Sequence, residues 1–188
     1  MNLPNILTLC RIAAIPVFAL AVLYYGAEFK EGTSSPWLRW LATGIFLGAV
    51  LTDALDGFFA RRLHQKTRLG TILDPLADKL LLLTALVLLC WNNGDAFPQL
   101  PLWLPVLVLS RDIIVVLGIT MIFMLGRGLE VRTHWIGKVA TVLQMTTLAL
   151  VLLGIPGAPL IAAVWLTGLA TFVSGTIYFT RGVKLLAG

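Results

Sequence analysis

Four aspartates are the residues of this chain with the clearest chemical meaning. Asp53, Asp56, Asp74 and Asp78 fall within one short stretch, although the whole chain has only nine acidic residues. The sequence around them is strongly apolar, and a carboxylate at membrane depth costs roughly 2.5–3.5 kcal/mol on insertion scales. A divalent metal ion is the simplest partner that would offset this cost. All-oxygen ligation favours Mg²⁺ or Mn²⁺, admits Ca²⁺ and argues against zinc.

The spacing of the aspartates predicts two helical faces. Asp53 and Asp56 are three positions apart and Asp74 and Asp78 are four apart, so each pair shares one face of a helix. A basic loop separates the pairs, which predicts an antiparallel hairpin with both pairs at similar depth near its cytoplasmic end. Inward carboxylates from two helices are a known way to build a metal site in a bundle, with room for two ions.

Small and basic residues accompany the aspartates. Gly57, Ala60 and Gly70 leave room for a bulky ligand, and Arg61 offers a forked donor suited to phosphate oxygens. Metal ions, carboxylates and an arginine together predict a diphosphate site. Taken singly, Asp74 fits a helix cap and the basic loop fits a membrane anchor. The alignment of four carboxylates favours a catalytic metal site over these structural roles.

The composition predicts an all-α integral membrane protein. Of its 188 residues, 59% are hydrophobic and 12% are charged, and the mean hydropathy is +0.93. A soluble domain has about 25% charged residues. The net charge of +5 therefore indicates loops beside an anionic lipid leaflet, with no nucleic acid as partner.

Six apolar segments are each long enough to cross a bilayer as a helix, which takes about 20 residues. They are separated by turns rich in glycine, proline and asparagine. We expect a single transmembrane catalytic domain over residues 1–188, with helices at 4–26, 36–61, 71–91, 101–126, 134–154 and 157–181.

The basic residues predict the orientation. They concentrate in the second and fourth loops and at the C-terminus, as Arg61, Arg62, Lys66, Arg68, Arg127, Arg132, Arg181 and Lys184. Lysine and arginine favour the cytoplasmic side. We therefore expect a multi-pass protein of the inner (cytoplasmic) membrane of the cell, with both termini and the active site facing the cytoplasm.

The run D-x2-D-G-x2-A-R-x8-G-x3-D-x3-D is identified as the signature of the CDP-alcohol phosphatidyltransferases. It is complete here, as Asp53, Asp56, Gly57, Ala60, Arg61, Gly70, Asp74 and Asp78. The six-helix plan is also similar to that family, so the resemblance covers nearly the whole chain. It implies a family-like helix bundle and a homodimer.

The resemblance implies that CDP-diacylglycerol binds with divalent metal, that its phosphatidyl group passes to an alcohol, and that CMP is released. Carried over by position, the metal ligands are Asp53, Asp56, Asp74 and Asp78. Asp78 is also implied as the general base that takes the proton of the acceptor hydroxyl. The implied CDP site consists of Gly57, Ala60, Arg61 and Gly70.

Two further stretches bear on the acceptor. Residues 2–11 (NLPNILTLCR) and 136–145 (IGKVATVLQM) are similar to the bacterial phosphatidylglycerophosphate synthases, which implies glycerol 3-phosphate. The Arg-Asp pair at Arg111 and Asp112 departs from the Arg-Glu of those synthases and is similar to the cardiolipin synthases of the same superfamily. Phosphatidylglycerol, or the alcohol of another CDP-alcohol phosphotransferase, is therefore the alternative acceptor.

Cations within or beside the apolar segments are candidates for the acceptor phosphate. Arg111 and Lys138 suit a phosphate-bearing acceptor, and Arg11 and Arg68 are further candidates. The ordinary alternatives are that Arg111 pairs with Asp112 and that Lys138 extends to the membrane surface.

A cation transporter is the rival from another functional class, with the carboxylates forming an ion path. Such a protein would be expected to spread acidic groups through the membrane depth and to have discontinuous helices. The clustering of all four aspartates beside one basic loop disfavours transport. An inactive scaffold gains no support, because the motif is complete.

Overall fold

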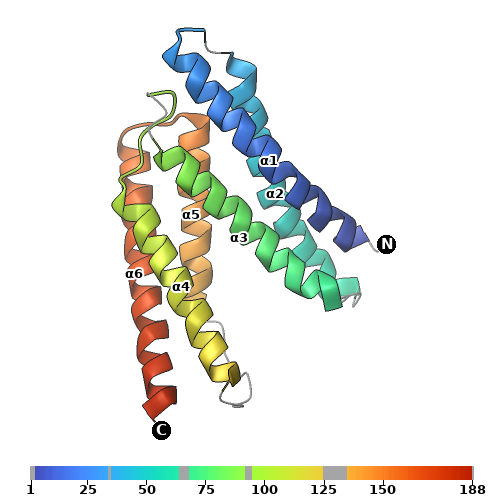
Figure 1. Ribbon diagram of the computed structural model, residues 1–188, viewed down its shortest axis with the longest axis vertical. Coiled ribbons are helices and arrows are strands. Elements are labelled where there is room, and N and C mark those ends of the chain that lie inside the picture. The colour runs from blue at the N-terminus through green and yellow to red at the C-terminus, as the bar shows by residue number, and fades with distance from the viewer. Residues whose placement is uncertain (1–2, 34, 64–67, 92–94, 125–134, 188) are drawn as a thin grey trace. The chain divides into compact units, whose positions relative to one another are not determined.

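The computed structural model describes the backbone of residues 3–33, 35–63, 68–91, 95–124 and 135–187. Within these ranges the side chains are described except at 3–7, 53–63, 68–75, 119, 121–124 and 181–187. The described chain forms six helices and no strand (Figure 1). They are α1 (Leu3–Lys30), α2 (Pro36–Leu63), α3 (Arg68–Cys90), α4 (Trp103–Met124), α5 (Trp135–Leu153) and α6 (Ala158–Ala187).

The predicted all-α fold and its six helices are confirmed. The largest difference is at the end of α6, which reaches Ala187 instead of residue 181. The apolar length limits only the part of a helix that can lie in lipid, whereas the helix itself continues until its backbone hydrogen bonding stops. Three described segments are long and apolar enough to cross a membrane, namely Thr8–Lys30, Trp135–Leu153 and Ala158–Thr180. Six spans therefore stay a prediction.

The junction between α1 and α2 shows why these helices end and begin where they do. Gly32 has a left-handed backbone (φ +74), and its N–H donates to the carbonyl of Phe29 at 3.2 Å while Thr33 N–H donates to Glu28 at 2.9 Å. This pair of bonds is a Schellman motif, which closes a helix C-terminus at a glycine. The next helix starts at Pro36, a residue suited to the first helical position.

The end of α5 is closed in the same way and is then locked by an arginine from α2. Gly154 has φ +66, and the N–H of Ile155 donates to the Leu150 carbonyl at 2.9 Å. The Nε of Arg39 donates to the Leu152 carbonyl at 2.9 Å. A Cβ atom at Gly154 would lie 1.7 Å from Nη2 of Arg39, so a side chain there would displace the Arg39 guanidinium.

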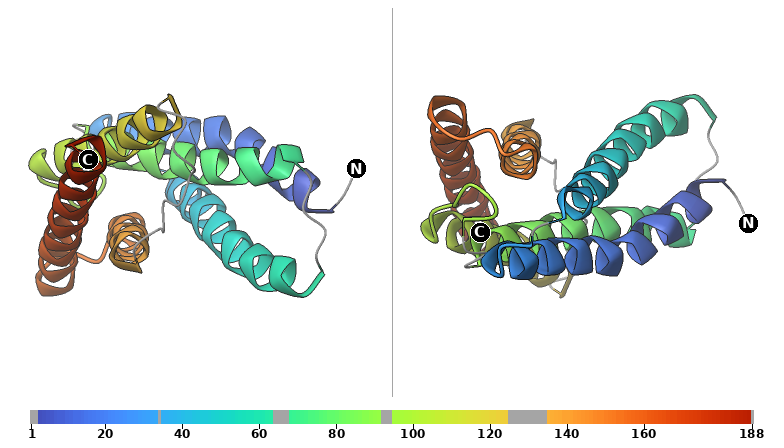
Figure 2. Two further views of the ribbon diagram at one scale, coloured as in Figure 1. Left: turned by 90° about the horizontal axis from the view of Figure 1, so that it is seen from below. Right: turned by 90° about the horizontal axis from the view of Figure 1, so that it is seen from above.

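The described chain divides into two compact units. The first contains Met1–Gln99 and Leu148–Ile155, and the second contains Leu100–Thr147 and Pro156–Gly188. In the first unit, α1 packs against both α2 and α3 (Figure 1). Among the described residues, α2 and α3 contact each other less than either contacts α1, and Figure 2 shows α3 beside α1 while α2 leaves them at an angle. In this part of the chain, the expected hairpin is joined chiefly through α1.

Aromatic and aliphatic side chains fill the core of the first unit. Phe18 of α1 and Phe46 of α2 are fully buried, with ring centroids 6.2 Å apart. Tyr25 of α1 meets Phe97 edge-on at 5.2 Å. Such tilted ring pairs add to the free energy gained by burying their area. This core fixes α1 against the helices of the motif.

The second unit is organised by the packing of α4 on α6. Trp103 of α4 lies against Gly168 of α6, where a Cβ atom would come within 2.7 Å of the indole ring. The ring centroids of Trp103 and Trp165 are 5.5 Å apart. Thr147 of α5 and Thr167 of α6 are buried and share a hydrogen bond of 2.8 Å, which satisfies two hydroxyls that would be costly to bury alone.

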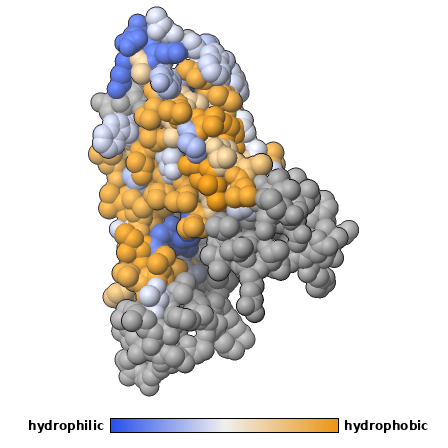
Figure 3. All heavy atoms as spheres, turned by 45° about the vertical axis from the view of Figure 1, so that its right-hand side comes forward, coloured by the Kyte–Doolittle hydropathy of each residue, from blue (hydrophilic) through white to orange (hydrophobic). Residues whose placement is uncertain are grey.

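The described surface is unusually apolar. Figure 3 shows hydrophobic side chains over much of one face and hydrophilic ones gathered at the end formed by the turn between α1 and α2. In the first unit, three exposed tryptophans mark the end opposite the motif, since α2 begins with Trp37 and Trp40 and Trp91 follows α3. Tryptophans are enriched where a membrane meets water.

Candidate active site

The structure places the motif on two helices. The backbone of Asp53, Asp56, Gly57, Ala60 and Arg61 lies in the C-terminal part of α2, and that of Arg68, Gly70 and Asp74 in the N-terminal part of α3. The helical assignment expected from the spacing is therefore confirmed. The side chains of these residues lie outside the described part of the chain, so their roles stay predictions.

Asp78 is the motif residue whose side chain is described, and it is bound by an arginine of α1. Its Oδ1 lies 2.5 Å from Nη1 of Arg11, with exposed fractions of 21% and 4% for the two side chains. Nη2 of the same guanidinium donates to the Thr52 hydroxyl at 3.3 Å, and that hydroxyl donates to the Ala49 carbonyl at 2.9 Å. Arg11 therefore joins α1 to α3 and to α2.

This contact gives Arg11 a specific place in the site. Thr52 directly precedes Asp53, so one guanidinium contacts a motif residue on α3 and the residue next to a motif residue on α2. A nearly buried arginine needs a carboxylate or hydroxyl partner to offset the loss of its hydration. The expected role of Arg11 at the acceptor phosphate is untested, but its described partners are a carboxylate and a hydroxyl.

The chemistry of the donors fits a hard divalent cation. Asp78 supplies a carboxylate oxygen on α3, and the other three aspartates lie on the same two helices by backbone position. Among the residues with described side chains, no three or more histidine, cysteine or acidic residues are grouped so that they could hold a metal ion. Carboxylates without nitrogen or sulfur donors are the ligands that Mg²⁺ and Mn²⁺ prefer.

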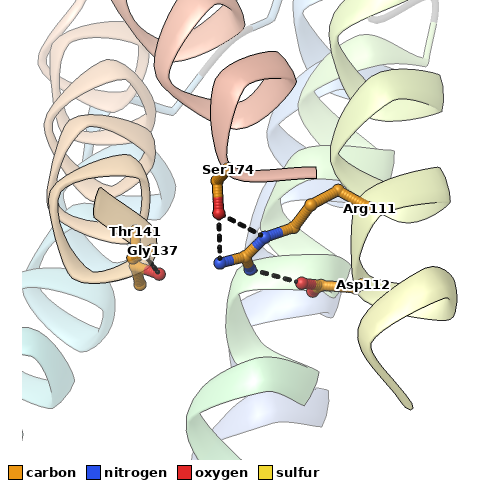
Figure 4. A network of polar contacts seen from close by, with 5 residues as sticks. All are labelled: Arg111, Asp112, Gly137, Thr141 and Ser174. Atoms are coloured by element: carbon orange, nitrogen blue, oxygen red, sulfur yellow. Dashed lines mark hydrogen bonds and ion pairs between the residues drawn. The ribbon is translucent and has the colours of Figure 1, made fainter. Parts of the chain in front are cut away.

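A second polar cluster surrounds Arg111 in the middle of α4 (Figure 4). Its Nη1 donates to Oδ1 of Asp112 at 2.7 Å, and its Nε and Nη2 reach the Ser174 hydroxyl of α6 at 3.4 and 3.3 Å. Ser174 is 1% exposed. The ordinary alternative for Arg111, pairing with Asp112, is therefore observed, together with a partner 63 positions away.

An aromatic ring and a glycine complete the surroundings of Arg111. The guanidinium carbon lies 5.8 Å from the centre of the Tyr178 ring, a distance at which a cation is attracted to the ring face. On the opposite helix, Gly137 of α5 faces the guanidinium without a side chain (Figure 4). Lys138, the next residue, has an exposed side chain.

The structure thus brings two predicted cations into defined sites and adds residues that the sequence did not single out. Thr52, Ser174 and Tyr178 were missed because a hydroxyl within an apolar helix gives no sign of its partner. The four-residue spacing of Ser174 and Tyr178 places them on one helix face, which was the available signal. Gly137 lies within residues 136–145, and nothing in that stretch of sequence indicates its closeness to Arg111.

Comparison with known proteins agrees with this architecture. Residues 1–175 match the family described as CDP-alcohol phosphatidyltransferase. The chain is 35% identical to the CDP-diacylglycerol–glycerol-3-phosphate 3-phosphatidyltransferase of Bacillus subtilis (strain 168), over 98% of this chain and 97% of that protein. It is 38% identical to the protein of the same name in Escherichia coli (strain K12), over 79% of this chain and 75% of that protein.

A third relative covers the full chain. It is the "Probable phosphatidylglycerophosphate synthase" of Mycobacterium tuberculosis (strain ATCC 25618 / H37Rv), which is 35% identical over 100% of this chain and 84% of that protein. The apolar helices and these bacterial relatives identify a membrane protein. Because the family match extends over nearly the whole sequence and includes the complete aspartate motif, this chain belongs to the CDP-alcohol phosphatidyltransferase family.

Proposed function

We propose that this protein transfers the phosphatidyl group of CDP-diacylglycerol to glycerol 3-phosphate and releases CMP. The observation that carries the proposal is the near full-length identity to relatives whose names specify that donor and that acceptor. The Arg111–Asp112 pair keeps phosphatidylglycerol as the alternative acceptor, because that dipeptide is similar to the one in cardiolipin synthases.

In the proposed reaction, the free hydroxyl of the acceptor attacks the phosphorus that carries diacylglycerol. The bond from this phosphorus to the bridging diphosphate oxygen breaks, and CMP leaves with the electron pair. Asp78 takes the proton of the attacking hydroxyl as general base. In support of this role, its carboxylate is partly accessible and is held in a fixed orientation by Arg11.

Arg11 thereby acts as a positioning residue in the proposed mechanism. Its contacts with Asp78 and Thr52 hold the carboxylate relative to α1 and α2, and a fixed general base lowers the entropy cost of the reaction. Arg68 and Arg11 both remain candidates for the acceptor phosphate, and the kinetic experiment described below separates the two roles of Arg11.

Asp53, Asp56, Asp74 and Asp78 are proposed to hold two Mg²⁺ or Mn²⁺ ions. Bound ions of this kind neutralise a diphosphate and stabilise the charge that develops on the departing nucleotide. Gly57, Ala60 and Gly70 are proposed to leave room for CDP, and Arg61 to donate to its phosphate oxygens. Removal of divalent cations with EDTA should abolish turnover, and added Mg²⁺ or Mn²⁺ should restore it.

Arg111 and Lys138 are proposed to bind the phosphate of the acceptor. The Arg111 side chain is 14% exposed and carries five N–H donors. Its three described hydrogen bonds leave one donor on each terminal nitrogen without a partner among the described residues. N–H groups on the two terminal nitrogens suit a phosphate, which has several acceptor oxygens. Asp112 neutralises the positive charge of Arg111, and the exposed Lys138 would supply a second positive charge for the phosphate.

The proposed setting is the inner membrane, with both termini and the active site on the cytoplasmic side. The basic residues near the motif and the tryptophans at the opposite end support this orientation. A homodimer is proposed from the family resemblance, and the exposed apolar helix faces leave surface that lipid or a second copy could cover.

The acceptor can be tested by measuring CMP release from CDP-diacylglycerol with purified protein in detergent or nanodiscs. Glycerol 3-phosphate should support metal-dependent release, whereas phosphatidylglycerol and free glycerol should not. Turnover with phosphatidylglycerol and none with glycerol 3-phosphate would instead identify a cardiolipin synthase. Cation flux into liposomes without any CMP release would favour the transporter.

A further inference from the structure

Gly137 occupies a position where no side chain fits without moving Arg111. A Cβ atom there would lie 2.9 Å from Nη2 of Arg111, 3.2 Å from the Tyr178 hydroxyl oxygen and 3.6 Å from the Ser174 hydroxyl oxygen. The first distance is shorter than nonbonded contacts allow, and the second is tight. The guanidinium and two α6 side chains therefore approach α5 at the one residue that lacks a side chain.

The same guanidinium is held from its other sides. Asp112 binds Nη1 on one flank, the nearly buried Ser174 hydroxyl accepts from Nε and Nη2 on the other, and the Tyr178 ring lies within cation–π distance. Figure 4 shows the guanidinium between α6 and the start of α5. Because Ser174 bridges two nitrogens of one planar group, it fixes the plane of that group as well as its place.

We propose that Gly137, Ser174 and Tyr178 are positioning residues that set the plane of the Arg111 guanidinium for the acceptor phosphate. Gly137 acts by providing room, Ser174 by orienting two nitrogens, and Tyr178 by covering one face. This inference rests on the proposed function, because it assigns residues that prepare its acceptor site. An arginine fixed before binding loses less conformational entropy when phosphate binds.

Helix stability alone does not account for the glycine. Gly137 is the third residue of α5 and its φ is not positive, so the backbone there does not need a glycine and would accept alanine if only α5 mattered. The remaining alternative is that the glycine merely allows α4, α5 and α6 to pack closely. Packing and positioning predict different kinetic results.

The chain provides two matched controls for a glycine-to-alanine change near Arg111. A Cβ atom at Gly175 of α6 would touch Cγ and Cβ of the same arginine at 3.5 and 3.6 Å, which is ordinary contact. A Cβ atom at Gly118 of α4 would meet nothing within 4 Å. Gly175→Ala therefore adds a methyl group beside the stem of Arg111, whereas Gly137→Ala adds one against its charged end.

The test compares steady-state kinetics and ligand-dependent thermal stability of these variants. We expect Gly137→Ala to raise the KM for glycerol 3-phosphate by about tenfold, as for a displaced binding group. Its kcat should stay within about twofold, since losing a contact that binds the ground state and the transition state equally raises KM alone. The KM for CDP-diacylglycerol should be unchanged. Ser174→Ala should act in the same direction, and both control variants should match wild type.

A readout without turnover is the rise in unfolding temperature on adding glycerol 3-phosphate in the absence of donor. This rise should be lost in Gly137→Ala and Ser174→Ala and kept in the controls, while the unfolding temperature without ligand should not fall in Gly137→Ala.

Equal KM values for glycerol 3-phosphate in Gly137→Ala and Gly175→Ala would overturn the inference. So would a lower unfolding temperature with proportional losses for both substrates, because that result indicates packing. If the Gly137→Ala protein does not accumulate in the cell, the KM and thermal shift of Ser174→Ala decide the question, since that substitution only removes an oxygen. A wild-type protein that does not respond to glycerol 3-phosphate would instead refute the proposed function, and this inference with it.

Discussion

At the scale of residues, two arginines within the described part of the helices each have a partner on another helix. Arg11 meets Asp78 from 67 positions away, and Arg111 meets Ser174 from 63 positions away. The sequence could name the charged residues, because charges are rare in apolar segments and need a reason. It could not name their partners, because helix rotation and packing decide which side chains meet. The helical placement of the motif aspartates was predictable because their spacing is local.

Replacing Arg11 should show whether it serves the general base or the acceptor phosphate. We expect Arg11→Gln to lower kcat at least about tenfold, because Asp78 loses the group that orients it. The KM for glycerol 3-phosphate should change little. Arg11→Lys should recover part of the activity by restoring the charge.

Arg39→Gln is the matched control for this change, since Arg39 also bridges helices in the first unit but binds the Leu152 carbonyl at the end of α5. It should cost stability and leave kcat near wild type. A selective rise in the KM for glycerol 3-phosphate in Arg11→Gln, with kcat retained, would contradict the positioning role and support phosphate binding.

At the scale of elements, helix ends were more predictable than helix packing. Gly32 and Gly154 both close helices at positive φ, which is the usual role of glycine at a helix C-terminus, although α1 continues to Lys30 instead of ending at residue 26. The sequence also predicted a hairpin between α2 and α3 but could not show that α1 lies against both helices, because contacts between apolar faces leave little mark on the residue pattern. Similarly, nothing in the local sequence indicated that Arg39 covers Gly154.

The end of α5 provides a stability prediction with an internal control. Gly154→Ala and Gly157→Ala both place alanine at positive φ, at +66 and +86, but only the first would meet Arg39, since a Cβ atom at Gly157 meets nothing within 4 Å. The left-handed backbone should cost about 1–2 kcal/mol in each variant.

Gly154→Ala should therefore unfold at a clearly lower temperature than Gly157→Ala in the same detergent, because it also displaces Arg39 from the Leu152 carbonyl. Identical unfolding temperatures would mean that the Arg39 contact adds nothing to stability.

At the scale of the whole molecule, the fold distributes the two polar clusters between the two compact units. Arg11 and Asp78 belong to the first unit, and Arg111 and Ser174 belong to the second. Six helices of suitable length, an apolar surface and a one-sided distribution of basic residues fit a multi-pass protein. The predicted orientation of the protein rests on the charge distribution alone and can be measured independently of activity.

Reporter fusions should report this orientation. A fluorescent protein fused after residue 188 should fluoresce in a bacterial host, because it folds in the cytoplasm, and alkaline phosphatase at the same point should be inactive. Fusions after Asp95, in the turn between α3 and α4, should give the opposite pair of results. Active phosphatase at the C-terminus would refute the predicted topology.

The most direct test of the central claim is the transfer of radiolabelled glycerol 3-phosphate into lipid by purified wild-type protein and by Asp78→Asn. With CDP-diacylglycerol and Mg²⁺ or Mn²⁺, the wild type should form a labelled phospholipid and an equal amount of CMP. Asp78→Asn should form neither above background, while still folding and binding the donor. Label that stays in the aqueous phase with wild type, or transfer by Asp78→Asn at the wild-type rate, would contradict the account.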